Sequence, residues 1–124
     1  MDIVTYRERR PRLVVATAAD AAAVIDRGID FLNHRGPTHW ERAITRPVRV
    51  ESHVWCPLSQ VYARAFEAFR RRYPSATTAY DYALYELGLW ESNDEAYYGF
   101  HALDRAAALL LDAGWLSVLR ARRH

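Results

Sequence analysis

The stretch CPLSQVYARAFEAFRRRY, residues 56–73, carries the clearest structural signal in this sequence. Cys56 occupies an N-cap position with Pro57 at the first helical position, and Pro74 follows as a terminator. Because apolar residues recur every three or four positions, the stretch predicts one amphipathic helix. Its expected buried face consists of Leu58, Val61, Tyr62, Ala65, Phe66, Phe69 and Tyr73, and its polar face of Ser59, Gln60, Arg64, Glu67, Arg70 and Arg71.

Further helices are predicted on both sides of this stretch from capping residues and apolar spacing. Thr17 and Asp20 form a capping box, and Gly36-Pro37 ends the helix that the box begins. The other helical segments are expected at Trp40 to Ile44, at about Thr77 to Leu87, in a very short helix after Ser92, and at about Leu103 to Arg120. The last helix is expected to bury Leu103, Ala106, Ala107, Leu110, Leu111, Gly114 and Val118.

Two segments carry strand signals. Residues 47–55 alternate Val48, Val50 and Val54 with polar residues, and residues 13–16 form a short apolar run. The expected fold is mainly α: a single-domain helical bundle of about four to five helices, with a small two-stranded β element if these two segments pair. Residues 1–12 are expected to form an arginine-rich N-terminal arm, and residues 13–124 a single globular helical domain.

Composition narrows the class of protein. The chain has 124 residues and is 51% hydrophobic, which is enough to bury a core. The longest apolar run, residues 106–111, is far too short to cross a membrane, and no signal peptide is recognised. Cys56 is the only cysteine, so no internal disulfide can form. We therefore expect a cytoplasmic protein without a membrane partner.

The basic residues have an unusual composition. All 17 are arginine and lysine does not occur, which together with the alanine-rich stretches suggests a GC-rich coding genome. The formal net charge is only +2, which by itself does not imply binding to nucleic acid.

Several short motifs occur along the chain: Gly28 to Leu32, Trp40 with Ile44, Cys56-x-Leu58-x-Gln60-x-Tyr62, Leu87-Gly88-Leu89, Tyr98-Gly99-Phe100 and the late Trp115. Together they resemble the motifs of a family of small uncharacterised proteins of actinobacteria and their phages. The likeness covers roughly residues 24 to 120, although Ser59 stands where that family carries glycine. The resemblance implies a phage or actinobacterial setting and transfers no activity and no functional residue.

Cys56 is the one candidate for catalysis. A thiol at a helix N-terminus is activated by the helix dipole, and His53 or His101 could act as its base. Potential zinc ligands are also present, namely His34, His39, His53 and Cys56, but their spacing is not that of a standard zinc site. The alternative to a catalytic Cys56 is a small buried residue that caps the helix and packs in the core. We expect no metal and no cofactor, and we favour a non-enzymatic role.

Two surfaces are candidates for binding. Aromatic residues crowd the region from Tyr80 to Phe100, and Tyr82 cannot share the buried face of its helix with Tyr80. The proposed contact surface consists of Tyr82, Tyr85, Trp90 and Tyr97 with an acidic rim of Glu86, Glu91 and Asp94. Possible phosphate contacts are Arg9, Arg10, Arg70, Arg71, Arg72, Arg122 and Arg123.

The favoured function is a non-catalytic regulatory or accessory factor that binds a protein partner or itself, with host takeover or defence evasion as its setting. The alternative is an arginine-mediated nucleic-acid or nucleotide-phosphate binding protein. The third hypothesis is a Cys56-dependent hydrolase or transferase.

Overall fold

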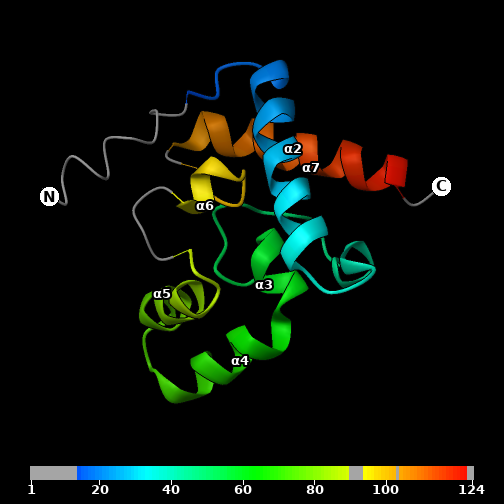
Figure 1. The fold of residues 1–124 in the computed structure, drawn as a ribbon. Helices are drawn as coiled ribbons and strands as arrows, with labels where there is room; N and C mark the ends of the chain where they lie inside the picture. The colour runs from blue at the N-terminus through cyan, green and yellow to red at the C-terminus, as the bar shows by residue number, and fades with distance from the viewer. Residues whose placement is uncertain (1–13, 90–93, 103, 123–124) are drawn as a thin grey trace, which may run out of the picture.

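The computed structural model describes residues 14–89, 94–102 and 104–122 (Figure 1). The predicted N-terminal arm lies outside these residues. Helices dominate the described part of the chain, which contains no strand, so the predicted mainly-α fold is confirmed. In chain order the elements are α2 (Ala18–Arg35), the 3-10 helix η1 (Trp40–Ala43), α3 (Pro57–Val61), α4 (Ala63–Arg72), α5 (Ala76–Glu86), α6 (Asp94–Tyr97) and α7 (Arg105–Arg122).

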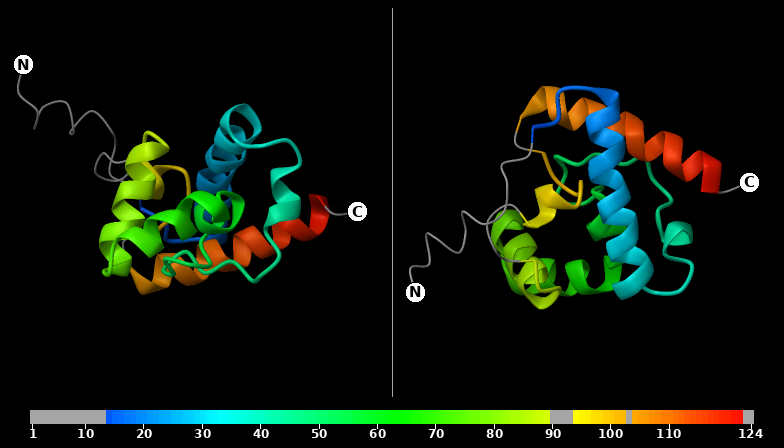
Figure 2. Two further views of the ribbon diagram at one scale, coloured as in Figure 1. Left: turned by 90° about the horizontal axis from the view of Figure 1, so that it is seen from below. Right: turned by 45° about the horizontal axis from the view of Figure 1, so that its top comes forward.

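Two helix pairs organise the molecule. The two long helices, α2 and α7, cross and pack on each other at one end, whereas α4 and α5 pack together at the other end (Figures 1 and 2). The short helix α3 contacts both η1 and α4, and α6 contacts α2. The core therefore continues from the α2–α7 crossing through α3 to the α4–α5 pair.

Trp115 occupies the centre of the α2–α7 crossing and is fully buried. Its indole N–H donates a hydrogen bond of 2.8 Å to the backbone carbonyl of Gly99, so its polar group is satisfied. The ring of Phe100 stacks on the Trp115 indole with centroids 6.1 Å apart, and Phe31 meets Phe100 edge-on at 5.7 Å. This aromatic cluster joins α2, α7 and the segment that follows α6.

Helix α2 begins as the sequence predicts. The Thr17 hydroxyl accepts a hydrogen bond from the Asp20 N–H at 3.1 Å, and the Asp20 carboxylate accepts one from the Thr17 N–H at 3.0 Å. The hydrogen bond that the Asp20 carboxylate accepts from the Ala16 N–H, aided by its contacts with Thr17, holds the pKa of Asp20 below its ordinary value. The predicted capping box is confirmed.

The predicted strand at residues 47–55 does not form; the segment is a series of turns. Both Val48 and Val50 are buried, but the Val50 N–H donates to the Asp112 carboxylate rather than to a neighbouring strand. Residues 14–16, in the described part of the other expected strand, are also irregular. The alternating pattern was misleading because side chains and turn hydrogen bonds within the segment, not a β ladder, satisfy this backbone.

The single helix predicted after Cys56 is two helices. The backbone breaks at Tyr62, whose φ of −108° and ψ of 40° lie outside the helical region. Ser59 and Gln60, which were assigned to the polar face, are buried, and Ala65 of the expected apolar face is exposed. The assignment failed because the Ser59 and Gln60 side chains bind backbone groups inside the fold, where their burial costs little.

The buried stripe of α7 also differs from the predicted one. Ala107 and Leu111 are buried as expected, but Ala106 is exposed and Trp115 is at the centre of the buried face. Because apolar residues lie on two sides of this helix, the sequence is compatible with more than one buried face. The complete buried stripe is Ala107, Ala108, Leu111, Trp115 and Leu119.

Gly28 provides a test of the close packing at this crossing. A Cβ added at Gly28 would collide with the backbone carbonyl oxygen of Tyr98, which has no flexible side chain to move aside. Although alanine stabilises an exposed helix by about 1 kcal/mol relative to glycine, we expect Gly28→Ala to reduce the free energy of unfolding by about 3 kcal/mol. Urea denaturation measures this change.

Gly114 is the matched control. A Cβ at Gly114 would meet the terminal methyl group of Ile25 at 2.6 Å, and that group can rotate away. Gly114→Ala should therefore change the unfolding free energy by less than about 1 kcal/mol. Equal losses for the two variants would contradict the arrangement of the α2–α7 crossing.

Candidate functional site

Cys56 is placed as a structural residue. Its side chain is fully buried at the N-terminus of α3, and its sulfur accepts a hydrogen bond from the Ser59 N–H at 3.4 Å, as an N-cap does. The sulfur also contacts the Ser59 hydroxyl at 3.3 Å and the Tyr80 hydroxyl at 3.4 Å. Its hydrogen-bond partners among the described residues are therefore serine and tyrosine groups.

The candidate bases contact groups other than the thiol. The His53 ring lies against the Tyr80 ring with centroids 4.9 Å apart and planes inclined by 33°, and His101 Nδ1 lies 3.3 Å from the Val50 carbonyl oxygen. His34 Nδ1 lies 2.7 Å from the Asp30 carbonyl oxygen, and His39 adopts the left-handed conformation before η1. Within the described residues, no three His, Cys, Asp or Glu side chains are grouped to hold a metal ion.

The burial of Cys56 gives a measurable expectation. We expect a thiol-specific chromogenic disulfide reagent to react with Cys56 at least about a hundredfold more slowly in the native protein than in denaturant. The reason is that the sulfur becomes accessible only after the surrounding structure opens. A variant with Ser117→Cys, at an exposed position of α7, should label rapidly at the new site under the same conditions. Rapid native labelling of the wild type would show that the thiol is accessible.

Two tyrosines of α5 remain exposed on the surface. Tyr82 is 47% exposed and Tyr85 is 61% exposed, whereas Tyr80 of the same helix is only 6% exposed. The Tyr82 ring stacks on Tyr73 with centroids 4.5 Å apart and planes inclined by 9°, and Phe69 lies nearly parallel to both rings. Tyr82 is therefore packed on aromatic rings from the end of α4.

The rest of the predicted contact surface is distributed differently. Glu86 is exposed next to Tyr85, but Tyr97 lies against α2, where the Arg27 guanidinium sits 4.4 Å from its ring centroid. Arg27 also donates a hydrogen bond of 2.9 Å to the Tyr97 carbonyl. Trp90, Glu91 and the side chain of Asp94 lie outside the part of the chain that the structure describes.

The predicted phosphate contacts do not form one group. Arg70, Arg71 and Arg72 follow one another in the last turn of α4, and the Arg72 guanidinium lies 5.6 Å from the Tyr73 ring centroid. Arg122 lies at the end of α7, where its guanidinium is 5.2 Å from the Trp40 ring centroid. Arg9, Arg10 and Arg123 lie outside the described residues.

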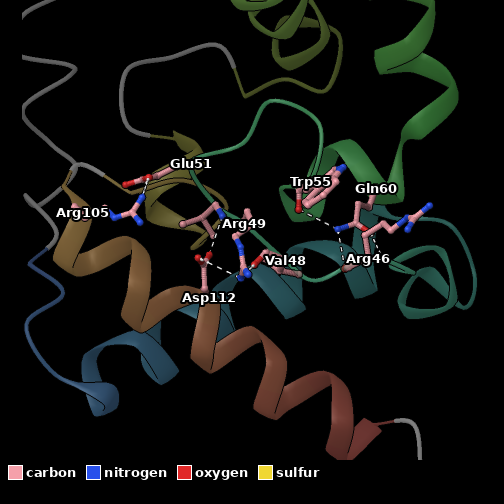
Figure 3. Close-up of polar contacts among 9 residues, drawn as sticks. Arg46, Val48, Arg49, Glu51, Trp55, Gln60, Arg105 and Asp112 are labelled. Carbon is pink, nitrogen blue, oxygen red and sulfur yellow. Dashed lines mark hydrogen bonds and ion pairs between the residues drawn. The ribbon is translucent and has the colours of Figure 1, made fainter.

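A groove that the sequence did not predict runs between the 47–52 turns and α7. It has a volume of about 590 Å³, and the exposed leucines Leu109 and Leu116 line it. Asp112 lies in its wall, where the carboxylate accepts a hydrogen bond of 2.8 Å from the Val50 N–H and faces Arg49 at 4.0 Å (Figure 3). The spacing of Leu109 and Leu116 on one side of α7 was the signal that could have located this surface.

Two further polar contacts hold the turns in place. Arg105 donates a hydrogen bond of 2.9 Å to the Glu51 carboxylate, which ties the start of α7 to the same turns. The Gln60 side chain accepts from the Arg46 N–H and donates to the carbonyls of Arg46 and Trp55 (Figure 3). The Arg105–Glu51 and Gln60–Arg46 bonds join residues 54 and 14 positions apart, which is why periodicity could not indicate them.

Desolvation raises the pKa of Asp112 above its ordinary value of 3.8, although the Val50 N–H and Arg49 act in the opposite direction. The folded protein therefore holds this proton at pH values at which the unfolded chain has released it. It follows that the contribution of Asp112 to stability is most favourable below pH 3.8 and falls as the pH rises through the raised pKa.

Asp112→Asn tests this linkage. The amide oxygen can still accept the Val50 hydrogen bond, but the desolvated charge is absent, so the stability of the variant relative to the wild type should rise from below pH 3.8 to neutral pH. Asp112→Ala, which removes the acceptor, should be less stable than Asp112→Asn throughout. Urea unfolding over this pH range provides the measurement, and a difference between wild type and Asp112→Asn that does not vary with pH contradicts the prediction.

Comparisons with known proteins provide no relative: no family model or curated protein matches the sequence, and no solved structure matches the fold. The resemblance to small actinobacterial and phage proteins stays a prediction. Within the described residues, no helix is both long enough and apolar enough to cross a membrane.

Proposed function

We propose that this protein is a non-catalytic accessory factor that binds a partner protein through the exposed face of α5. The observation that carries this proposal is the exposure of Tyr82 and Tyr85, at 47% and 61%, on a helix whose other large apolar side chains, Tyr80 and Leu84, are buried. Large aromatic side chains that stay on a surface are typical anchors of protein interfaces. The proposed setting is the cytoplasm of an actinobacterium or the infection cycle of one of its phages.

The arrangement of α4 and α5 favours tight binding. Tyr82 is already stacked on Tyr73, so little side-chain entropy is lost when a partner covers it. Tyr85 and Glu86 are three and four residues further along α5, so they share the face of Tyr82. The exposed Glu86 adds a negative charge at the margin, which favours a partner with a basic residue there.

The surroundings of Cys56 support the non-catalytic part of the proposal. The thiol is fully buried and bonded to Ser59 and Tyr80, and the residues around it satisfy the ends of α3 and the preceding turns. These contacts provide a structural reason for the cysteine that needs no reaction.

The experiment is a quantitative capture assay with the double variant Tyr82→Ala and Tyr85→Ala. The immobilised wild-type chain is exposed to lysate of a candidate host, and bound proteins are quantified by mass spectrometry. We expect the amount of specifically captured protein to be at least about tenfold lower for the double variant than for the wild type. The reason is that interface anchors each contribute about 2 kcal/mol or more to the binding free energy. Unfolding measurements establish that the variant is folded.

Trp55→Ala is the matched control, because Trp55 is an exposed aromatic residue at 45% exposure that lies on the turns before α3. It should capture as the wild type does. Capture that is equal for wild type and the double variant would rule out the α5 face as the binding surface.

One observation favours a second candidate, binding of single-stranded nucleic acid. The three consecutive arginines Arg70, Arg71 and Arg72 adjoin the stacked rings of Tyr73 and Tyr82, and cationic side chains beside aromatic rings can hold phosphates and stacked bases. This function requires an affinity for oligonucleotides that falls steeply with salt. The absence of binding to labelled single-stranded DNA and RNA at low salt would eliminate it.

A further inference from the structure

Helix α7 has a second apolar face that points away from its own core. Its exposed residues Ala106, Leu109, Ala113, Leu116 and Arg120 are spaced alternately by three and four positions. The buried stripe that contains Leu111 and Trp115 lies on the other side of the helix. Leu109 is 55% exposed and Leu116 is 47% exposed, which is a substantial apolar area for one helix.

Alternate spacing by three and four is the pattern with which one helix packs along another. The exposed residues also alternate in size, because alanine at 106 and 113 alternates with leucine at 109 and 116. When two such helices run antiparallel, Leu109 of one faces Ala113 of the other, and Leu116 faces Ala106. Each leucine then fills the space above a small side chain, and this arrangement is the same on both copies, as an isologous dimer requires.

The charges near the two ends of α7 favour the antiparallel direction. At its N-terminal end lie Asp104, which caps the helix by accepting a hydrogen bond of 2.8 Å from the Ala107 N–H, and Glu51, which is already paired with Arg105 of the same copy. Arg120 and Arg122 lie in its last turn. An antiparallel pair places the arginines of each copy near the acids of the other, whereas a parallel pair would place like charges together.

From this pattern we infer that the exposed face of α7 binds a second copy of the chain, giving an antiparallel, two-fold symmetric dimer. The helix is 18 residues long, so it presents about 27 Å of length to its partner. The turns at 47–52, which form the opposite wall of the groove, lie beside the path of the partner helix. This inference concerns a surface other than the α5 face and does not depend on the proposed function.

Sedimentation velocity over a wide concentration range tests the inference. The wild type should pass from the 14.4 kDa monomer to a species of twice that mass. We expect Leu109→Gln and Leu116→Gln each to raise the dimer dissociation constant at least about tenfold. The matched control Val54→Gln, at a residue with the 47% exposure of Leu116 but on the turns before α3, should dimerise as the wild type does.

Disulfide trapping tests the direction of pairing. In one chain, residues 106 and 116 are ten positions apart, or about 15 Å along the helix, which is too far for a disulfide. The double variant Ala106→Cys with Leu116→Cys should form a cross-linked dimer on mild oxidation, and each single variant should form little. Cys56 does not interfere, because it is fully buried.

Three results would overturn the inference: a chain that stays monomeric up to its solubility limit, dimerisation that Leu109→Gln and Leu116→Gln leave unchanged, or single cysteine variants that cross-link as well as the double variant. The α5 variant Tyr82→Ala with Tyr85→Ala is expected to dimerise normally. Failure of the proposed function and failure of this inference are therefore distinguishable.

Discussion

The close contact of α2 with the segment after α6, beside Trp115 of α7, is the constraint on which the rest of the structure depends. Gly28 lets the backbone of Tyr98 approach α2, and the carbonyl of the next residue, Gly99, accepts the Trp115 indole hydrogen bond. Once this cluster is fixed, the inner face of each long helix is determined. The same geometry leaves Leu109 and Leu116 on the outside of α7.

Polar side chains provide backbone hydrogen bonds that a β-sheet provides in many small domains. Gln60 from α3 binds both ends of the 46–55 segment, and Asp112 from α7 binds its middle at Val50. These side chains satisfy part-buried backbone groups that would otherwise lack these partners. The segment can therefore cover the core without regular structure, and its position on α7 forms one wall of the groove.

The sequence was informative where a signal was local. The capping box at Thr17 and the proline start after Cys56 follow from residues close in the chain. Features that depend on residues distant in sequence could not be derived: Gln60 binds the Arg46 backbone, 14 positions away, and the Val50 N–H binds Asp112, 62 positions away. For the candidate site, exposure of Tyr82 was predictable from its angle to Tyr80, and the apolar wall of the groove from the spacing of Leu109 and Leu116, whereas the opposite wall of turns was not.

The central claim is that Tyr82 and Tyr85 stay on the surface of the folded chain, while Tyr80 and Trp115 belong to the core. Hydroxyl-radical footprinting of the dilute, purified protein measures this directly, because oxidation of each aromatic side chain follows its exposure to solvent. The account predicts rapid oxidation of Tyr82 and Tyr85 and strong protection of Tyr80 and Trp115, which are 6% and 0% exposed. Protection of Tyr82 and Tyr85 to the same degree as Tyr80 would contradict it.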